Sequence, residues 1–301
     1  MLDLLLEPLG YSFMQRSVQV AVAVGIICSV MGTYLLVQRL ALLGDAISHS
    51  LLPGLAIAFM IGINIFIGAF VAGVLSTVLI NWIRSRTSVK EDAAMGIVFS
   101  AFFALGITLI TLIQKEAKVD LNHFLFGNIL GVTQADVYTT VGITIGVLLV
   151  VTLLFKELQF YSFDPVGAQA AGLPVHVLNS GLMMLIALTL VASMKAVGVI
   201  LVLALMITPG ATAYLLVSRL HQVMLLASGF GMLASLSGMY LSYYFNLPSG
   251  PTIVLVSFGL FCLAFLFSPK QGILTQPPST QTRGNLFWKE LRDLLRRRSR
   301  G

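Results

Sequence analysis

Charged side chains are scarce in this sequence of 301 residues. Only 10% of the residues are Asp, Glu, Lys or Arg and 57% are hydrophobic, whereas a soluble domain has about 25% charged residues. This deficit and the long apolar runs exclude an ordinary soluble domain and predict an all-α polytopic membrane protein. A membrane β-barrel is disfavoured, because its strands would alternate apolar and polar residues and these runs do not.

Cysteines are few and known catalytic motifs are absent. The two cysteines, Cys28 and Cys262, lie inside apolar runs, so neither a disulfide nor a cysteine metal site is indicated. The sequence contains no HExxH, no G-x-S-x-G and no P-loop. We therefore expect a chain that is not an enzyme. If it takes part in active transport, ATP must be hydrolysed by another polypeptide.

The apolar residues fall into nine segments, each near the roughly 20 residues that cross a bilayer as a helix. The segments are 18–38, 41–62, 63–83, 92–113, 137–155, 175–194, 197–217, 222–245 and 250–268. We expect a bundle of these spans in one transmembrane domain, residues 1–269. The number of spans is eight or nine, because only GINI separates the second segment from the third. A further apolar patch at 124–132 is too short to span and should be interfacial or half-inserted.

The positive charge is concentrated after the last apolar segment. Residues 270–301 contain eight basic and two acidic side chains, which accounts for the whole net charge of +6. The sequence therefore predicts a basic cytoplasmic tail, made of a polar linker and an interfacial helix, and no nucleic-acid-binding face. This tail is either a topology signal or a site for lipid headgroups.

Basic connections also set the orientation. The loops at 84–92 and 218–222 carry cations and should be cytoplasmic, like the tail. Counting spans between them places 156–174 inside and 114–136 outside. With nine spans, the N-terminus is expected outside and the C-terminus inside.

One apolar stretch, LLGDAISHSLLPGLAIA at 42–58, contains an aspartate and a histidine four residues apart. At this spacing Asp45 and His49 share one face of a helix. A carboxylate and an imidazole on one face can both bind a divalent transition metal, and an acid inside a span is seldom without a function. Two alternatives remain. Asp45 could be the N-cap of a helix that starts there, or His49 could only hydrogen-bond a neighbouring helix.

Pro-Gly pairs interrupt two apolar segments, at Pro53-Gly54 in the first half and Pro209-Gly210 in the second. Helix breaks at matching places predict an internal repeat with a substrate path between the halves. Ordinary kinked helices are the alternative.

A short amphipathic stretch lies in the inner loop at 156–174. Asp164 and Pro165 have the order of an N-cap and a first helical residue, and Gly172 is a plausible stop. The small side chains of Ala168 and Ala171 would let another protein pack closely. The alternative is a plain loop with a single helical turn.

These stretches together resemble the membrane permease subunit of the ABC transporters that import zinc, manganese or iron. The resemblance extends over residues 12–269 and is carried by 42–59, 90–106, 123–130, 162–174 and 195–216. It implies a helical bundle similar to the permease of the vitamin-B12 importer, in the bacterial plasma (inner) membrane. It also implies a homodimer of this chain, a dimer of a cytoplasmic ATPase subunit and an extracytoplasmic metal-binding protein.

The resemblance further implies roles for particular residues. Asp45 and His49 become ligands of the transported ion, and the helix after Asp164 becomes the coupling helix that contacts the ATPase. Weaker candidates are Glu91 and Asp92, which could instead be an acidic helix start, and Asp120 and His123 in the outer loop.

No tightly bound cofactor is expected, only the transported divalent ion. The overall resemblance favours Mn²⁺, and Zn²⁺ or Fe²⁺ come next, although affinity order alone favours zinc. The alternative function is a stand-alone, ion-coupled secondary metal transporter or channel.

Overall fold

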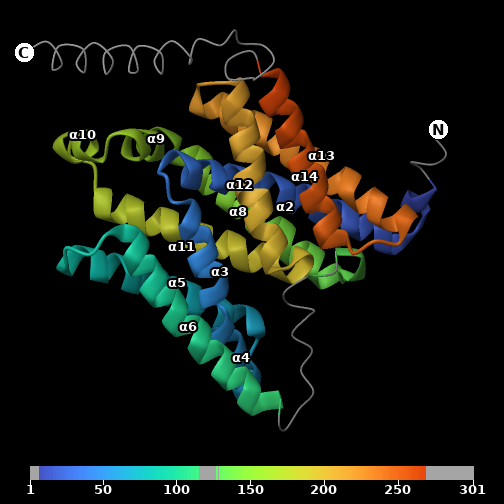
Figure 1. Ribbon diagram of the computed structural model, residues 1–301, viewed down its shortest axis with the longest axis horizontal. Coiled ribbons are helices and arrows are strands. Elements are labelled where there is room, and N and C mark those ends of the chain that lie inside the picture. Colours follow the sequence, from blue (N-terminus) through green and yellow to red (C-terminus); the bar gives the residue numbers. More distant parts are fainter. Residues whose placement is uncertain (1–6, 115–126, 128, 269–301) are drawn as a thin grey trace, which may run out of the picture.

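The computed structural model describes residues 7–114, 127 and 129–268, and within these ranges the regular structure is helical throughout (Figure 1). The helices are α2 (Ser12–Val37), α3 (Ala41–Ser50), α4 (Leu52–Ile61), α5 (Ile65–Arg86), α6 (Glu91–Gln114), α8 (Gln134–Leu153), α9 (Phe155–Phe163), α10 (Pro165–Ala170), α11 (Val175–Val197), α12 (Val199–Leu216), α13 (Leu220–Phe245) and α14 (Ser249–Phe267). Two short 3-10 turns are η1 (Pro8–Gly10) and η2 (Ile129–Gly131).

Eight stretches of helix are long and apolar enough to cross a bilayer: α2, α3 with α4 as one span, α5, α6, α8, α11, α13 and α14. The apolar part of α12, Leu201–Leu216, is shorter, and counting it gives nine. The all-α, multi-pass fold with eight or nine spans is thus confirmed for the described part of the chain. The tail at 270–301 lies outside the described residues.

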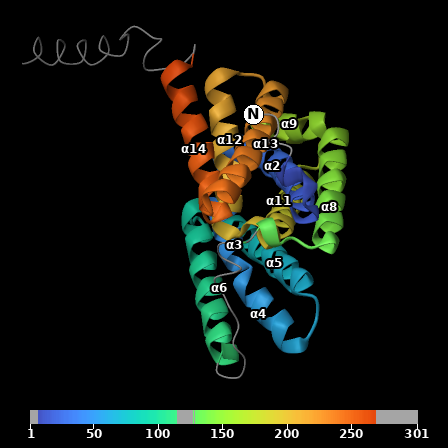
Figure 2. The same ribbon diagram turned by 90° about the vertical axis from the view of Figure 1, so that its right-hand side faces the viewer.

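The helices form two groups with α3 between them (Figure 2). The first group is built on α2, which packs against α12 and α13, and α14 packs on the outside of these two. The second group consists of α4, α5 and α6. Helices α3 and α11 contact members of both groups and therefore join them.

In the first group, glycines allow direct contact between helix backbones. A Cβ atom on Gly25 of α2 would lie 2.8 Å from the carbonyl oxygen of Gly231 on α13. A Cβ atom on Gly32 of α2 would collide with the backbone of Met206 on α12. Small residues at such crossings are the usual basis of helix packing in membranes, because lipid provides no hydrophobic drive for association.

In the second group, glycines also allow direct contact between helix backbones. Gly54 of α4 and Gly68 of α5 face each other so closely that a Cβ on either would collide with the backbone of the other. A Cβ on Gly106 of α6 would lie 2.6 Å from Cβ of Leu52 and 3.0 Å from the nitrogen of Pro53. Helix α4 is therefore packed tightly against both α5 and α6.

The two Pro-Gly pairs have different local structures. Helix α3 ends at Ser50 and α4 begins at Leu52, so the span formed by these two helices is interrupted just before Pro53-Gly54. In contrast, α12 runs without interruption from Val199 to Leu216 and contains Pro209 in its interior. The expected helix break at Pro209-Gly210 is therefore wrong. A proline removes one backbone hydrogen bond, but in a membrane the bonds on either side can keep the helix continuous. The pair of matching breaks, and with it this sign of an internal repeat, is lost.

Candidate functional site

Asp45 and His49 lie on one face of α3, one turn apart. The Nε2 atom of His49 is 3.5 Å from Oδ1 of Asp45, and the side chains are 24% and 50% exposed, respectively. Two atoms that each lie about 2.1 Å from one metal ion are themselves about 3.0–3.5 Å apart at bond angles of 90–110°. The spacing of this carboxylate and this imidazole therefore fits one ion bound by both.

Asp45 is not the cap of its helix. The N-cap of α3 is Leu40, which makes no side-chain cap, and Asp45 lies in the second turn. The two serines beside His49 are also occupied locally, because Ser48 and Ser50 donate their hydroxyl hydrogens to the carbonyls of Gly44 and Ala46 at 2.8 and 2.6 Å. On this part of α3, the carboxylate and the imidazole are therefore the groups suited to bind an ion.

Two aromatic rings from α6 enclose the imidazole of His49. The ring centroids of Phe99 and Phe103 each lie 5.3 Å from that of His49, at interplanar angles of 64° and 89°. The Nδ1 atom of His49 is buried and has no hydrogen-bond partner within the described structure. The second nitrogen of this imidazole is thus buried without a hydrogen bond in the described structure, and Nε2 is the nitrogen that lies near the carboxylate.

Within the described ranges 7–114, 127 and 129–268, no third side chain completes this pair. No group of three or more His, Cys, Asp or Glu side chains in these ranges could hold a metal ion. Divalent transition metals take at least four ligands. Asp45 and His49 therefore supply at most part of a coordination shell.

Two of the weaker candidates, Glu91 and Asp92, lie at the start of α6. Glu91 is the first residue of α6 and Asp92 the second, two turns before Phe99, and the Asp92 side chain is exposed. This position matches the alternative of an acidic helix start. Asp120 and His123 lie outside the described residues.

The predicted short helix after Asp164 is present as α10. The Asp164 side chain caps it by accepting a hydrogen bond from the Gly167 N–H at 2.8 Å, and Pro165 opens the helix. At the other end, Gly172 has φ +84°, and the N–H groups of Gly172 and Leu173 donate to the carbonyls of Gln169 and Ala168. These two bonds form a Schellman motif, so the glycine stop is confirmed.

One expectation for α10 is wrong. Ala168 is 0% exposed and packs inside the chain, so it cannot contact another protein directly. Ala171 and Gly172 are exposed. The most exposed large apolar side chains here are Phe163 at the end of α9 and Val166 on α10, which are 60% and 77% exposed. The exposed apolar surface of α9 and α10 is therefore centred on Phe163 and Val166.

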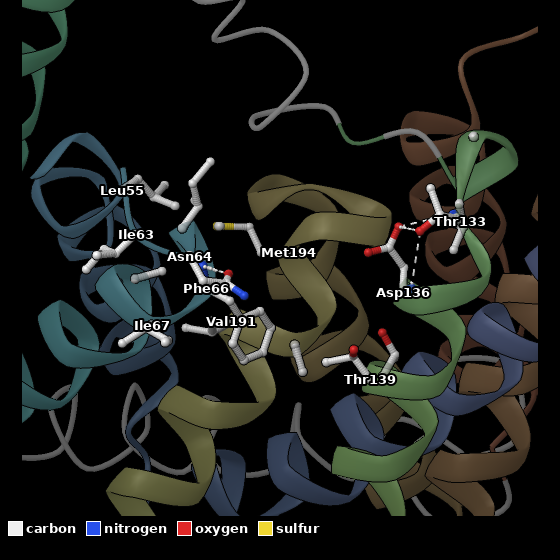
Figure 3. A pocket seen from close by; sticks show the side chains of 16 residues that line it. Leu55, Ile63, Asn64, Phe66, Ile67, Thr133, Asp136, Thr139, Val191 and Met194 are labelled. Atoms are coloured by element: carbon white, nitrogen blue, oxygen red, sulfur yellow. Dashed lines mark hydrogen bonds between the residues drawn. The ribbon is translucent and has the colours of Figure 1, made fainter. Parts of the chain in front are cut away.

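A separate cavity of about 630 Å³ lies between α5 and α8. Figure 3 shows Asn64 on one side of it, Thr133 and Asp136 on the other, and Val191 and Met194 of α11 between them. Its polar groups cap helices: Asn64 accepts from the Phe66 N–H, and Thr133 and Asp136 form the capping box of α8. Neither Asp45 nor His49 lines this cavity, so it is distinct from the candidate metal site.

Phe99 and Phe103 could not be identified from the sequence. They lie in an apolar segment, AMGIVFSAFFALG, in which each phenylalanine has the same hydrophobic character as its neighbours. Their i, i+4 spacing places them on one face, but only the structure shows that this face meets His49.

Comparison with known proteins agrees with this architecture. Residues 10–268 match the ABC 3 transport family. The manganese transport system membrane protein MntC of Halalkalibacterium halodurans is 48% identical over 268 residues, covering 89% of this chain and 91% of the relative. A probable iron transport system membrane protein of Haemophilus influenzae is 43% identical over 277 residues, covering 92% of this chain and 97% of the relative.

The fold also matches a solved structure, PsaBC from Streptococcus pneumoniae in complex with Fab. The TM-score is 0.81 at 40% sequence identity, and the match covers 89% of this chain and 96% of the other. With a family match over most of its length and relatives of this similarity, the chain belongs to the ABC 3 transport family.

Proposed function

We propose that this chain is the membrane-spanning permease subunit of an ATP-driven importer of a divalent transition metal, with Mn²⁺ as the favoured substrate. The observation that carries the proposal is the Asp45–His49 pair, with Nε2 and Oδ1 3.5 Å apart on α3 of an ABC 3 family member. In this role the chain hydrolyses no ATP and binds its ion only transiently, as cargo.

The charge and burial of the pair support transient binding. Asp45 supplies a negative charge for a cation inside an apolar span, where an unpaired acid is costly. One hard oxygen and one imidazole suit Mn²⁺, Fe²⁺ or Zn²⁺, and no cysteine lies on α3 to favour softer ions. Two protein ligands, of which Asp45 is half exposed, can exchange an ion more easily than a closed shell of four.

A homodimer would provide the missing ligands. Helix α6, which packs against α3, carries an exposed line of small residues: Ala93, Gly96, Ser100 and Ala104. Such residues let a second helix approach closely in a membrane. A two-fold axis beside this line would bring the Asp45 and His49 of two copies towards one path.

We further propose a dimeric ATPase subunit on the cytoplasmic side and an extracytoplasmic protein that delivers the ion. The exposed apolar side chains of Phe163 and Val166, together with Ala171 and Gly172, support α10 as the contact for the ATPase. This arrangement places the N-terminus outside and the C-terminus in the cytoplasm of a bacterium.

The favoured metal follows from the names of relatives. Relatives that are 41–48% identical to this chain are named for manganese, and the Haemophilus influenzae relative is named for iron. Because the manganese names are the more numerous among them, we expect Mn²⁺ first and Fe²⁺ or Zn²⁺ as competitors.

Uptake in proteoliposomes would test the proposal. The chain is reconstituted with its ATPase and binding protein, and ⁵⁴Mn²⁺ uptake is measured with ATP inside the cytoplasm-facing compartment, with and without each partner. We expect uptake to require all three proteins and ATP. Mn²⁺ uptake by this chain alone would instead support the ion-coupled secondary transporter.

A further inference from the structure

The orientation of a metal-binding histidine usually depends on its second nitrogen. In most metal sites, the ring N–H that does not face the metal donates to a carboxylate, a carbonyl or a water, and this bond fixes the ring. In His49, Nε2 faces Asp45, and the buried Nδ1 has no such partner in the described structure. The orientation of this imidazole must therefore be set in another way.

Two phenylalanines of α6 pack against the imidazole ring of His49. Phe99 and Phe103 lie one turn apart on α6, stacked at 5.7 Å, and both meet the His49 ring at 5.3 Å in T-shaped geometry. Edge-to-face contacts are directional because a ring has a negative face and a positive edge. Two of them at 64° and 89° restrict both the tilt and the rotation of the imidazole.

We propose that Phe99 and Phe103 position His49 for the transported ion. They keep Nε2 on the side of the Asp45 carboxylate while contributing no ligand atom of their own. The inference rests on the proposed function, since it takes Asp45 and His49 as ion ligands. It adds Phe99 and Phe103 of α6 to the residues that determine the affinity for the ion.

The arrangement separates the ligands from their support. Both ligands lie on α3, whereas both supporting rings lie on α6, which belongs to the other side of the α3–α6 contact. A shift of α6 along or away from α3 would remove the rings from His49. The imidazole would then lose its fixed orientation, and its bond to the ion would weaken.

Electron spin-echo spectroscopy of bound Mn²⁺ can test this, because it detects the ¹⁴N nucleus of a directly bound imidazole. The permease–ATPase complex is purified in lipid nanodiscs as wild type, Phe99→Ala, Phe103→Ala and the double variant. Mn²⁺ affinity is measured on the same samples. A bound imidazole modulates the echo of Mn²⁺ through its ¹⁴N nucleus, and we expect the double variant to lose this ¹⁴N modulation. We also expect it to bind Mn²⁺ about 10- to 100-fold more weakly, as when other residues that orient a metal ligand are lost.

Phe102→Ala is the matched control, because Phe102 lies on the same helix, is partly buried, and does not stack on His49 in the described structure. It should keep the modulation and the affinity. If the double variant does not assemble, Phe103→Leu takes its place, since leucine retains the bulk but not the ring. It should also weaken the modulation.

Wild-type modulation and affinity in the double variant, or equal losses in Phe102→Ala, would overturn the proposal. The proposed ion site fails in a different way: wild-type protein would then show no ¹⁴N modulation, or His49→Ala would retain it. The two failures are thus distinguishable in one set of spectra.

Discussion

Asp45 has half of its side chain exposed, whereas His49, one turn further along α3, is only 24% exposed. The carboxylate therefore presents the negative charge to the open side, and the imidazole lies behind it against Phe99 and Phe103. A cation that approaches from the open side meets the full charge first and the directional nitrogen second.

Loss of either ligand should abolish transport. We expect Asp45→Asn and His49→Ala to reduce Mn²⁺ uptake to background while the protein still inserts and assembles, because one remaining ligand cannot replace the water shell of the ion. Ser48→Ala is the control on the same helix, since its hydroxyl already bonds to Gly44. Near-normal uptake by both ligand variants would refute the assignment.

The surface for the ATPase should depend on Val166. This side chain is 77% exposed on α10, so Val166→Glu should weaken co-purification of the ATPase without affecting Mn²⁺ binding. Gln134→Glu, an exposed position at the start of α8, introduces the same charge elsewhere and should have no effect. Crosslinks to the ATPase from a cysteine at Val166 provide the direct measurement. Crosslinks only from residues 84–90 would assign the contact to that loop instead.

A bulky residue at Ala168 should act differently. Because Ala168 is fully buried, Ala168→Trp should destabilise the permease itself by about 1–3 kcal/mol, as overpacking does. A lower thermal midpoint of the permease without its ATPase is the expected result. An unchanged midpoint combined with lost ATPase binding would restore the view that Ala168 faces the partner.

The C-terminal end of α10 should be destabilised when Gly172 is replaced by a residue with a side chain. Gly172 has φ +84°, so Gly172→Ala imposes a left-handed conformation that costs about 1–2 kcal/mol. Gly181→Ala on α11 meets no neighbouring atom and needs no such conformation. Amide hydrogen exchange of residues 165–173 should accelerate in the first variant only. Equal protection in both variants would show that the motif contributes little.

The tail should be cytoplasmic and largely dispensable. A reporter fused after Gly301 should be active only inside the cell, and a chain ending at residue 269 should retain most of its Mn²⁺ uptake. The eight basic residues of 270–301 are the reason for this expectation. An extracellular reporter would contradict the proposed topology.

Several features could be predicted from the sequence because they depend on local chemistry. Apolar length predicts the spans, and the cap at Asp164 and the stop at Gly172 depend on neighbouring residues only. The i, i+4 spacing of Asp45 and His49 likewise determines that they share a face.

Features that depend on packing could not be predicted. In a membrane helix, lipid-facing and protein-facing sides are both apolar, so hydrophobic periodicity does not distinguish them. For this reason the contact of Phe99 and Phe103 with His49 gave no signal. The burial of Ala168 gave none either, because α10 has only 6 residues and is too short to show a periodic pattern. The continuity of α12 at Pro209 depends on its neighbours in the same way.

The glycine contacts restrict which parts of the molecule can move. Where Gly25 meets Gly231 and Gly54 meets Gly68, backbone rests on backbone, with no flexible side chain to absorb sliding or rolling. These contacts oppose sliding of α2 on α13 and of α4 on α5, so we expect relative motion of the two helix groups mainly at the seam between them. Since α3 lies in this seam (Figure 2), a hinge movement large enough to open a path also changes the surroundings of Asp45 and His49.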